Sequence, residues 1–370
     1  MREITHWEPA LNNLVDRIGP RFARSEARQC AKEYLRGLLI PTRRKNGWQL
    51  AAVTGDDTPY RFQQFLYRSR WDPDALRNDL RTYVVESLSD SNAVLVLDEV
   101  GFVKKGVQSA GVQYQPWGWP ERVENCQIGL FLSYASPRGV GFIDRTLFLP
   151  QEWFEDQERC RRAGIPEQIA FRPKQVLAQD MLTHARAAGV PFRWVTGSEI
   201  YGYDSSLRCW LETLRLGYVF PIAVDEKVFL NWNQYAVGDI LKQLQATQWA
   251  DRWVRSSFHQ RHGQSITYEW LCVPLMSPKI DGWKRRLLVH RAAGRGTELT
   301  PYLCFAPVDS TLAELVWTLE AREAAQASLE AARGEVGLDR YEVRTWTGWY
   351  RHITLACFAY TLLVHSCDSR

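Results

Sequence analysis

A continuous apolar run, Val94–Leu97, ends on the acidic residue Asp98 and limits the folds open to this chain. Unbroken runs of branched aliphatic residues are typical of strands that are buried on both faces of a sheet and covered by helices. Open α/β sheets place their chemistry at the carboxyl ends of such strands. The sequence therefore predicts an α/β fold in which Asp98 ends a central strand, and Asp98 is the first candidate site residue.

Helical and strand-like patterns divide the 370 residues into four parts. Before residue 90, apolar residues recur at helical spacing, whereas apolar runs and alternation after residue 91 favour strands. Towards the carboxyl end, helical spacing returns at residues 312–333 and 351–364. We predict a helical N-terminal domain, the first part of a mixed-sheet core, a β-rich insertion and the C-terminal helices of the core, at residues 1–90, 91–216, 217–310 and 311–370.

Three phrases stand in a fixed order along the chain. Residues 94–106 read VLVLDEVGFVKKG and residues 195–202 read VTGSEIYG. A later helical segment has the spacing L-x2-R-x3-Q-x6-R, in which Arg322, Gln326 and Arg333 stand. Together these phrases resemble the signature of bacterial insertion-sequence transposases of the DDE type, in the group whose helix reads Y-x2-R-x3-E-x6-K. The resemblance implies an RNase H-like mixed sheet flanked by helices, with a helical N-terminal domain and a β-rich insertion.

The departures from that family fall on its catalytic acids, because the aligned positions are Asp98, Ser198 and Gln326. In the two-metal mechanism, divalent cations held a few ångströms apart activate the nucleophile and stabilise the leaving oxygen. Mg²⁺ is a hard ion that carboxylates hold, whereas a hydroxyl and an amide carry no negative charge. We therefore expect no metal site and no cofactor, with Mg²⁺ bound only if neighbouring acids compensate.

Three glutamates are close enough in sequence to compensate. Glu199 follows Ser198, but in a continuing strand its side chain would point to the opposite face. Glu323 and Glu330 would share the helix face of Gln326, one turn away on either side. The alternative is that these glutamates are solvated surface charges.

Other residues of the similar phrases could still line a pocket. Tyr201, Glu342 and His352 join Glu199 and the three aligned positions as candidate catalytic residues. The structural alternative is that His352 caps a helix and Glu342 pairs with Arg344. The segment 114–120 (YQPWGWP) is rigid and aromatic, and it would suit stacking on a base or a flat ligand.

Basic residues predict a nucleic-acid surface. The net charge of +4 is mild, but residues 17–45 carry many more Lys and Arg than acids. A basic face of this kind is a nucleic-acid footprint in a suitable fold, and a solvated helix face otherwise. With the resemblance, double-stranded DNA is the expected partner and a homodimer is left open. The residues expected to contact it are Arg43, Arg44, Lys45, Lys104, Lys105, Arg322 and Arg333.

The cysteines and the hydropathy pattern favour a cytoplasmic protein. The eight cysteines form no CxxC pair and no zinc-ligand spacing with histidine, as expected of reduced thiols. Neither a signal peptide nor an apolar run of about 20 residues, the length that spans a membrane, is visible.

Three functions remain open. The first is a domesticated transposase that has lost its nuclease activity and kept DNA binding. The second is a scaffold recruited as a non-nuclease enzyme acting on a small molecule, since fold does not fix function. The third is an active transposase whose metal ligands are compensated.

Overall fold

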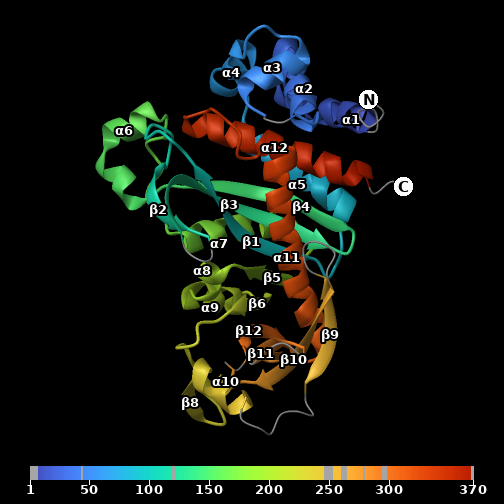
Figure 1. Cartoon of the computed structure of the whole chain (residues 1–370), viewed down its shortest axis with the longest axis vertical. Helices are drawn as coiled ribbons and strands as arrows, with labels where there is room; N and C mark the ends of the chain where they lie inside the picture. The colour runs from blue at the N-terminus through green and yellow to red at the C-terminus, as the bar shows by residue number, and fades with distance from the viewer. Residues whose placement is uncertain are drawn as a thin grey trace.

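The computed structural model describes residues 7–42, 45–118, 122–245, 253–259, 265–277, 280–293 and 298–367. It has a long mixed sheet at its centre (Figure 1). Among the described residues, the helices before the sheet are α1 (Glu8–Ile18), α2 (Ser25–Leu39), α3 (Gly47–Thr54), α4 (Tyr60–Tyr67) and α5 (Pro73–Leu88). The first four lie together at one end of the molecule, and α5 packs on the sheet.

The first part of the core contains strands β1 (Val94–Val103), β2 (Gln113–Trp117), β3 (Arg122–Ser136), β4 (Gly139–Phe148), β5 (Trp194–Gly197) and β6 (Gly217–Pro221). Its helices are α6 (Gln157–Arg162), α7 (Lys174–Ala187), α8 (Glu199–Gly202) and α9 (Ser205–Thr213). Strands β1, β5 and β6 run parallel, whereas β3 pairs antiparallel with β1, β2 and β4. This mixed sheet flanked by helices is the α/β architecture predicted from the sequence, and it is consistent with an RNase H-like nuclease fold.

The strands expected to form an insertion continue the same sheet. Beyond β6 the order is β12 (Thr300–Pro307), β11 (Trp283–Ala292), β10 (Ser265–Pro274) and β9 (Val254–His259). The strand β6 itself pairs with β5 on one side and β12 on the other, so the main sheet includes the start of the 217–310 segment. A separate hairpin of β7 (Lys227–Leu230) and β8 (Asn233–Ala236) lies beside α10 (Val237–Gln245).

Two long helices complete the chain, α11 (Leu312–Glu335) and α12 (Trp346–Cys367). A capping box starts α11, because the Thr311 hydroxyl accepts from the Glu314 amide while the Glu314 carboxylate accepts from the Thr311 amide. Helix α11 runs from the β9–β12 region across the sheet, and α12 lies between the sheet and the N-terminal helices (Figure 1).

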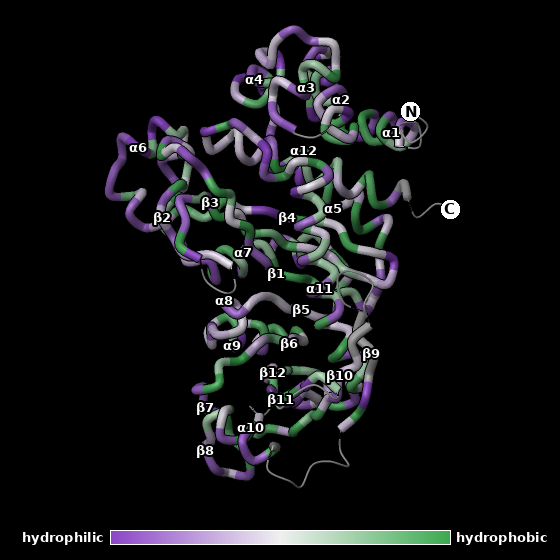
Figure 2. Tube along the Cα trace, viewed as in Figure 1, coloured by the Kyte–Doolittle hydropathy of each residue, from purple (hydrophilic) through white to green (hydrophobic). Residues whose placement is uncertain are grey.

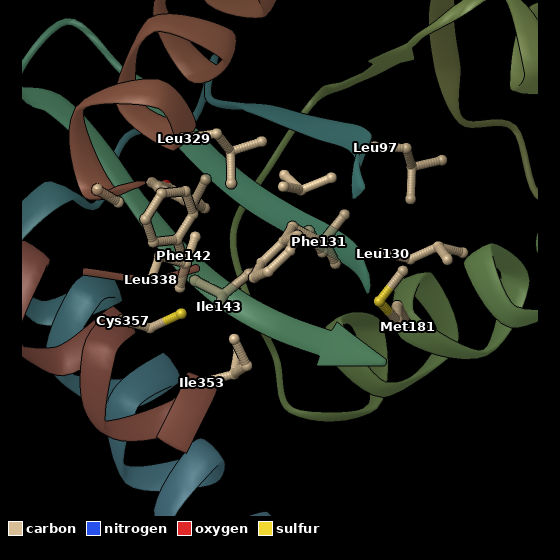
Figure 3. Close-up of a cluster of buried hydrophobic side chains, with 14 of the residues drawn as sticks. Leu97, Leu130, Phe131, Phe142, Ile143, Met181, Leu329, Leu338, Ile353 and Cys357 are labelled. Carbon is tan, nitrogen blue, oxygen red and sulfur yellow. The ribbon is translucent and has the colours of Figure 1, made fainter. Parts of the chain in front are cut away.

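The two faces of β1 are buried against different helices. Val94 and Val96 belong to the apolar cluster that includes residues of α11, whereas Leu95 and Leu97 belong to the larger cluster that includes α5, α7 and α12. Figure 2 shows the consequence, since β1 is coloured as one of the more hydrophobic segments. Figure 3 shows part of the larger cluster, where Leu97 and Met181 lie on one side of Phe131 and Cys357 and Ile353 of α12 lie on the other. Asp98 continues the alternation and falls on the α11 face.

Candidate functional site

The three aligned positions lie on one cleft. Asp98, Ser198 and Gln326, which come from β1, the end of β5 and α11, line a cavity of about 800 Å³. The parallel pairing of β1 with β5 ends at Leu97 and Gly197, so Asp98 and Ser198 are the next residues of neighbouring strands. The Ser198 amide donates to the Leu97 carbonyl at 3.3 Å. Residues 100 or more positions apart therefore meet at one edge of the sheet.

Gly197 allows the close approach of the two strands. A Cβ atom at this position would lie 2.7 Å from the Leu97 carbonyl oxygen. Any side chain at position 197 would therefore separate β5 from β1 at the point where Asp98 and Ser198 meet.

One face of α11 forms a wall of the cleft. Arg322, Gln326, Leu329, Glu330 and Arg333 all line it, at the spacing expected of a single helical face. The Gln326 side chain hydrogen-bonds to the Asp98 carboxyl group. Glu330 and Arg333 form an ion pair at 3.3 Å. The prediction that Glu330 shares the face of Gln326 is confirmed, whereas Glu323 lines a small neighbouring cavity instead.

Glu199 lies on the same cleft as Ser198, which corrects the expectation of opposite faces. The strand β5 ends at Gly197 and α8 begins at Glu199, so strand alternation does not apply. The Glu199 carboxylate pairs with the Arg322 guanidinium at 3.3 Å. This glutamate is therefore already matched to a protein cation.

Glu99 also forms an ion pair with a cationic side chain of the protein. It follows Asp98 on β1, so its side chain lies on the α7 face of the sheet, where α7 begins at Lys174. The Lys174 ammonium donates to the Glu99 carboxylate at 2.7 Å, and both side chains are largely buried. Both residues line the cleft.

Burial dominates the electrostatics of Asp98. It raises the pKa of Asp98 to about 6, although the Arg322 charge, the Glu99 amide and the Gln326 side chain all lower it. Two hydroxyls nearby are buried without a hydrogen-bond partner among the described residues, Ser198 Oγ and Tyr201 Oη. Burial also raises the pKa of Tyr201, and the charges of Glu99 and Asp98 raise it further. Tyr201 thus lies close to the candidate site, but it is wholly buried and does not line the cleft.

An aromatic side chain forms another wall. Trp117 lines the cleft, and its indole Nε1 donates to Glu124 at 2.9 Å. A Cβ atom on Gly101 would lie 2.2 Å from the Trp117 ring, so the ring packs directly on the backbone of β1. Position 119, the other tryptophan of the aromatic segment, lies outside the described residues.

The side chains present do not fit a pair of divalent cations. Of the three aligned positions only Asp98 carries a carboxylate, and the adjacent acids are paired with Lys174 and Arg322. Within the described ranges, no group of three or more His, Cys, Asp and Glu side chains is placed to hold a metal ion. Hard cations need several oxygen ligands with negative charge. In this cleft Lys174 and Arg322 already occupy the carboxylates of Glu99 and Glu199.

Two candidate residues lie away from the cleft. His352 is fully buried on α12, where its Nδ1 is 2.7 Å from the Tyr34 hydroxyl. Burial lowers the pKa of His352 to about 4, so the ring is neutral at physiological pH. Glu342 is exposed and borders a small cavity beside Tyr34 and Lys45. The prediction that these two residues join the aligned positions is wrong, because the N-terminal helices pack against them.

The expected DNA contacts divide into several groups. Arg322 and Arg333 line the cleft, and Lys105 is exposed on the turn after β1. Lys45 is buried and donates to the carbonyls of Leu38 and Ile40, each at 2.5 Å, so it cannot reach a phosphate.

Lys104 is also poorly placed to contact a DNA phosphate, and two further candidates lie outside the described residues. The Lys104 ammonium lies 3.5 Å from the centre of the Tyr341 ring. Burial lowers the pKa of Lys104 to about 8. Arg43 and Arg44 lie outside the described residues.

Acids from other helices pair with three arginines of the basic N-terminal stretch. Arg17 pairs with Glu86 and Arg21 with Asp79, both on α5, and Arg36 pairs with Glu8. A count along residues 17–45 misses these partners because they come from outside the stretch. Arg24 and Arg28 stay exposed and form no ion pair with another described residue.

Sequence reasoning missed Lys174 and Arg122, the two other cations of the cleft. A signal for Lys174 exists, since Pro173 predicts a helix start at that point and α/β sheets gather helix and strand ends at one edge. Arg122 is exposed at the start of β3. No local pattern distinguishes it from any other surface arginine.

Asp98→Asn is expected to change the pH dependence of stability. The folded pKa of Asp98 is about 6, above an unfolded value near 4, so the folded protein holds the proton more tightly than the unfolded chain. The free energy of unfolding is therefore highest below about pH 4 and decreases as pH rises through 6. Asparagine has no such loss. Relative to the natural protein, the variant should therefore gain up to about 3 kcal/mol in free energy of unfolding between about pH 3.5 and pH 8. Urea unfolding across this range measures it, and parallel curves for the two proteins would contradict it.

Comparison with known proteins agrees with this geometry. The profile of the DDE superfamily endonuclease family matches residues 17–239, which include Asp98 and Ser198 and end before Gln326. The chain is also similar to a probable transposase for insertion sequence element IS701 from Microchaete diplosiphon, at 24% identity over 209 residues. That match covers 54% of this chain and 52% of the transposase, so the chain spans about half the length of the relative.

The mixed α/β sheet and the cleft at its edge define a nuclease-type fold of the RNase H-like class. Since the family profile covers more than half of the chain, the protein belongs to the DDE superfamily endonucleases. No helix of the described residues is both long and apolar enough to cross a membrane.

Proposed function

We propose that this protein is a transposase-derived DNA-binding protein that does not cleave DNA. Asp98, Ser198 and Gln326 would correspond to the three metal-binding acids of the DDE signature, in the group with the Y-x2-R-x3-E-x6-K helix. The observation that supports the proposal most is the small number of unpaired negative charges in the cleft. One acid remains at the three positions, and Lys174 and Arg322 neutralise the neighbouring glutamates.

DNA binding does not depend on the missing acids. Affinity for duplex DNA comes largely from Lys and Arg side chains that neutralise phosphates. Four cations line the cleft, Arg122, Lys174, Arg322 and Arg333. Of these Arg122 is the most accessible, because it is exposed and forms no ion pair with another described residue.

The strand β3 offers a matched pair of variants to test this. Both side chains are exposed: Arg122 begins β3, and Arg138 lies in the turn after the other end of the strand, roughly 50 Å away at about 3.3 Å per residue. Arg122→Glu should weaken duplex binding about tenfold at low salt and reduce the salt slope by about 1 to 2, whereas Arg138→Glu should change affinity less than about threefold. Fluorescence anisotropy with a duplex, measured over a salt series, distinguishes them. Equal losses in both variants would place the DNA elsewhere.

A second candidate function rests on the buried hydroxyls of the cleft. Ser198 Oγ and Tyr201 Oη lack partners among the described residues, the pKa of Asp98 is raised to about 6, and Trp117 supplies a flat wall. A carboxyl group titrating near neutral pH is suited to general acid–base chemistry on a small molecule. No duplex binding at low salt by the natural protein would make this recruited enzyme the leading explanation.

A further inference from the structure

The indole of Trp117 is held in place at the wall of the cleft. Its Nε1 donates to the Glu124 carboxylate at 2.9 Å. A Cβ atom on Gly101 would lie closest to Cδ2 and Cε2, the two atoms that both rings share, at 2.2 and 2.3 Å, so one face of the indole lies on β1. The Gly118 amide donates to the Glu99 carboxylate at 3.4 Å, which ties the end of β2 to β1 as well. The part of the indole that these contacts leave uncovered borders the cavity.

An accessible cation, Arg122, stands directly opposite this ring on the neighbouring strand. Trp117 and Arg122 are register partners on the antiparallel strands β2 and β3. Directly opposite residues of such strands project to the same face, with Cβ atoms about 5 Å apart. Both side chains line the cleft, and Arg122 is exposed and pairs with no acid in the part of the chain that the structure describes. The cleft therefore presents a flat apolar surface and an accessible positive charge side by side.

The dimensions of the cleft favour a single strand over a duplex. Cavities of roughly 300 to 1,000 Å³ enclose one small organic molecule, so a volume of about 800 Å³ admits about one or two nucleotides and excludes a duplex. Within a duplex each base is stacked between its neighbours, and a protein reaches its face only after the base has left the stack. An aromatic wall inside such a cavity can therefore contact only an unpaired base.

We propose that the cleft holds an unpaired nucleotide of a DNA strand, with its base stacked on Trp117 and its phosphate beside Arg122. Proteins that bind single strands combine aromatic rings, on which bases of any sequence stack, with cations that follow the backbone. Because the indole is already fixed in position, little conformational freedom is lost when a base stacks on it. Binding of this kind rests on the DNA-binding function proposed above, and it specifies which form of DNA enters the cleft.

Duplexes with different ends test the stacking directly. The probes are a blunt duplex, the same duplex with a short unpaired tail, and the same duplex with an abasic tail, which has the phosphates of the unpaired tail but no bases. At low, constant salt we expect the natural protein to bind the duplex with the unpaired tail about tenfold more tightly than the duplex with the abasic tail. The two tails carry the same charge, so the difference measures the contact with the bases. Fluorescence anisotropy gives all three affinities.

Two variants of β2 assign the effect to the indole. Trp117→Leu removes the ring and keeps an apolar side chain, and Tyr114→Leu is its matched control, because Tyr114 is an exposed aromatic residue of the same strand that does not line the cleft. Trp117→Leu should remove most of the difference between the two tails and change affinity for the blunt duplex less than about threefold, whereas Tyr114→Leu should keep the difference. The comparison of tails in the natural protein requires no variant, so it decides the question even if Trp117→Leu does not fold.

Equal binding of the two tails by the natural protein would overturn the stacking, and so would a loss in Tyr114→Leu as large as the loss in Trp117→Leu. If Arg122→Glu still weakens binding of the blunt duplex, the proposed DNA binding survives either result. No binding of any probe would contradict the DNA binding and the stacking together. Displacement of the tailed duplex by a free deoxynucleoside monophosphate at roughly micromolar concentration would assign the cleft to a free nucleotide instead of a DNA strand.

Discussion

The double variant Ser198→Asp, Gln326→Glu is expected to bind Mn²⁺ at least about 100-fold more tightly than the natural protein. The three aligned side chains already line one cleft, so the two substitutions bring three carboxylates together at the sheet edge. Without metal these carboxylates repel one another, and the variant should be less stable than the natural protein. With metal it should be stabilised by mass action.

Thermal unfolding with and without Mn²⁺ measures both effects. Ser198→Asn together with natural Gln326 is the matched control, because it changes the size of the side chain without adding charge. A rise in melting temperature confined to the double variant agrees with the alignment. Equal responses in the variant and the control would mean that positions 198 and 326 do not face a common metal site.

Asp144→Asn is expected to reduce the free energy of unfolding by about 3 to 5 kcal/mol, because it leaves buried arginines without their counter-charge. The Asp144 side chain is 1% exposed and contacts Arg77 and Arg81. Asp180→Asn is the control, because its partner Arg172 is a surface residue and such pairs contribute less than about 1 kcal/mol. Urea unfolding at pH 7 compares the two, and similar losses would contradict the prediction.

The same residue sets a pH dependence with a defined sign. Burial alone would raise the pKa of Asp144, but the nearby His184 ring and the charges of Arg77, Arg145 and Arg81 outweigh it and hold the pKa at about 2. Because the folded pKa lies below the unfolded value, the stabilisation is present above about pH 4 and is lost as pH falls to 2, by about 2 kcal/mol in total. Asp144→Asn should lack this acid step.

The sequence predicted the framework of the site because that framework follows from local patterns. The apolar run Val94–Leu97 forms the central strand β1, with Asp98 facing the site. Helical spacing placed Arg322, Gln326 and Arg333 on one face of α11. Periodicity and the order of the motifs contain this information without knowledge of tertiary contacts.

The charge state of the site could not be predicted in the same way. Lys174 and Glu99 are 75 residues apart, and Arg322 and Glu199 are 123 apart. Strand alternation failed for Glu199 because β5 ends one residue before Ser198. His352 was misplaced for a similar reason, since its partner Tyr34 is 318 residues away. Such pairings depend on how the helices pack on the sheet, which spacing along the chain does not specify.

The most direct test of the central claim is a cleavage assay. The natural protein, incubated with supercoiled plasmid and with a duplex oligonucleotide in Mg²⁺ or Mn²⁺, should produce no nicks above the level of a no-protein control, because the cleft lacks the carboxylates that would hold two cations. Metal-dependent nicking that disappears in Asp98→Ala would contradict the account and show that the remaining side chains still support catalysis.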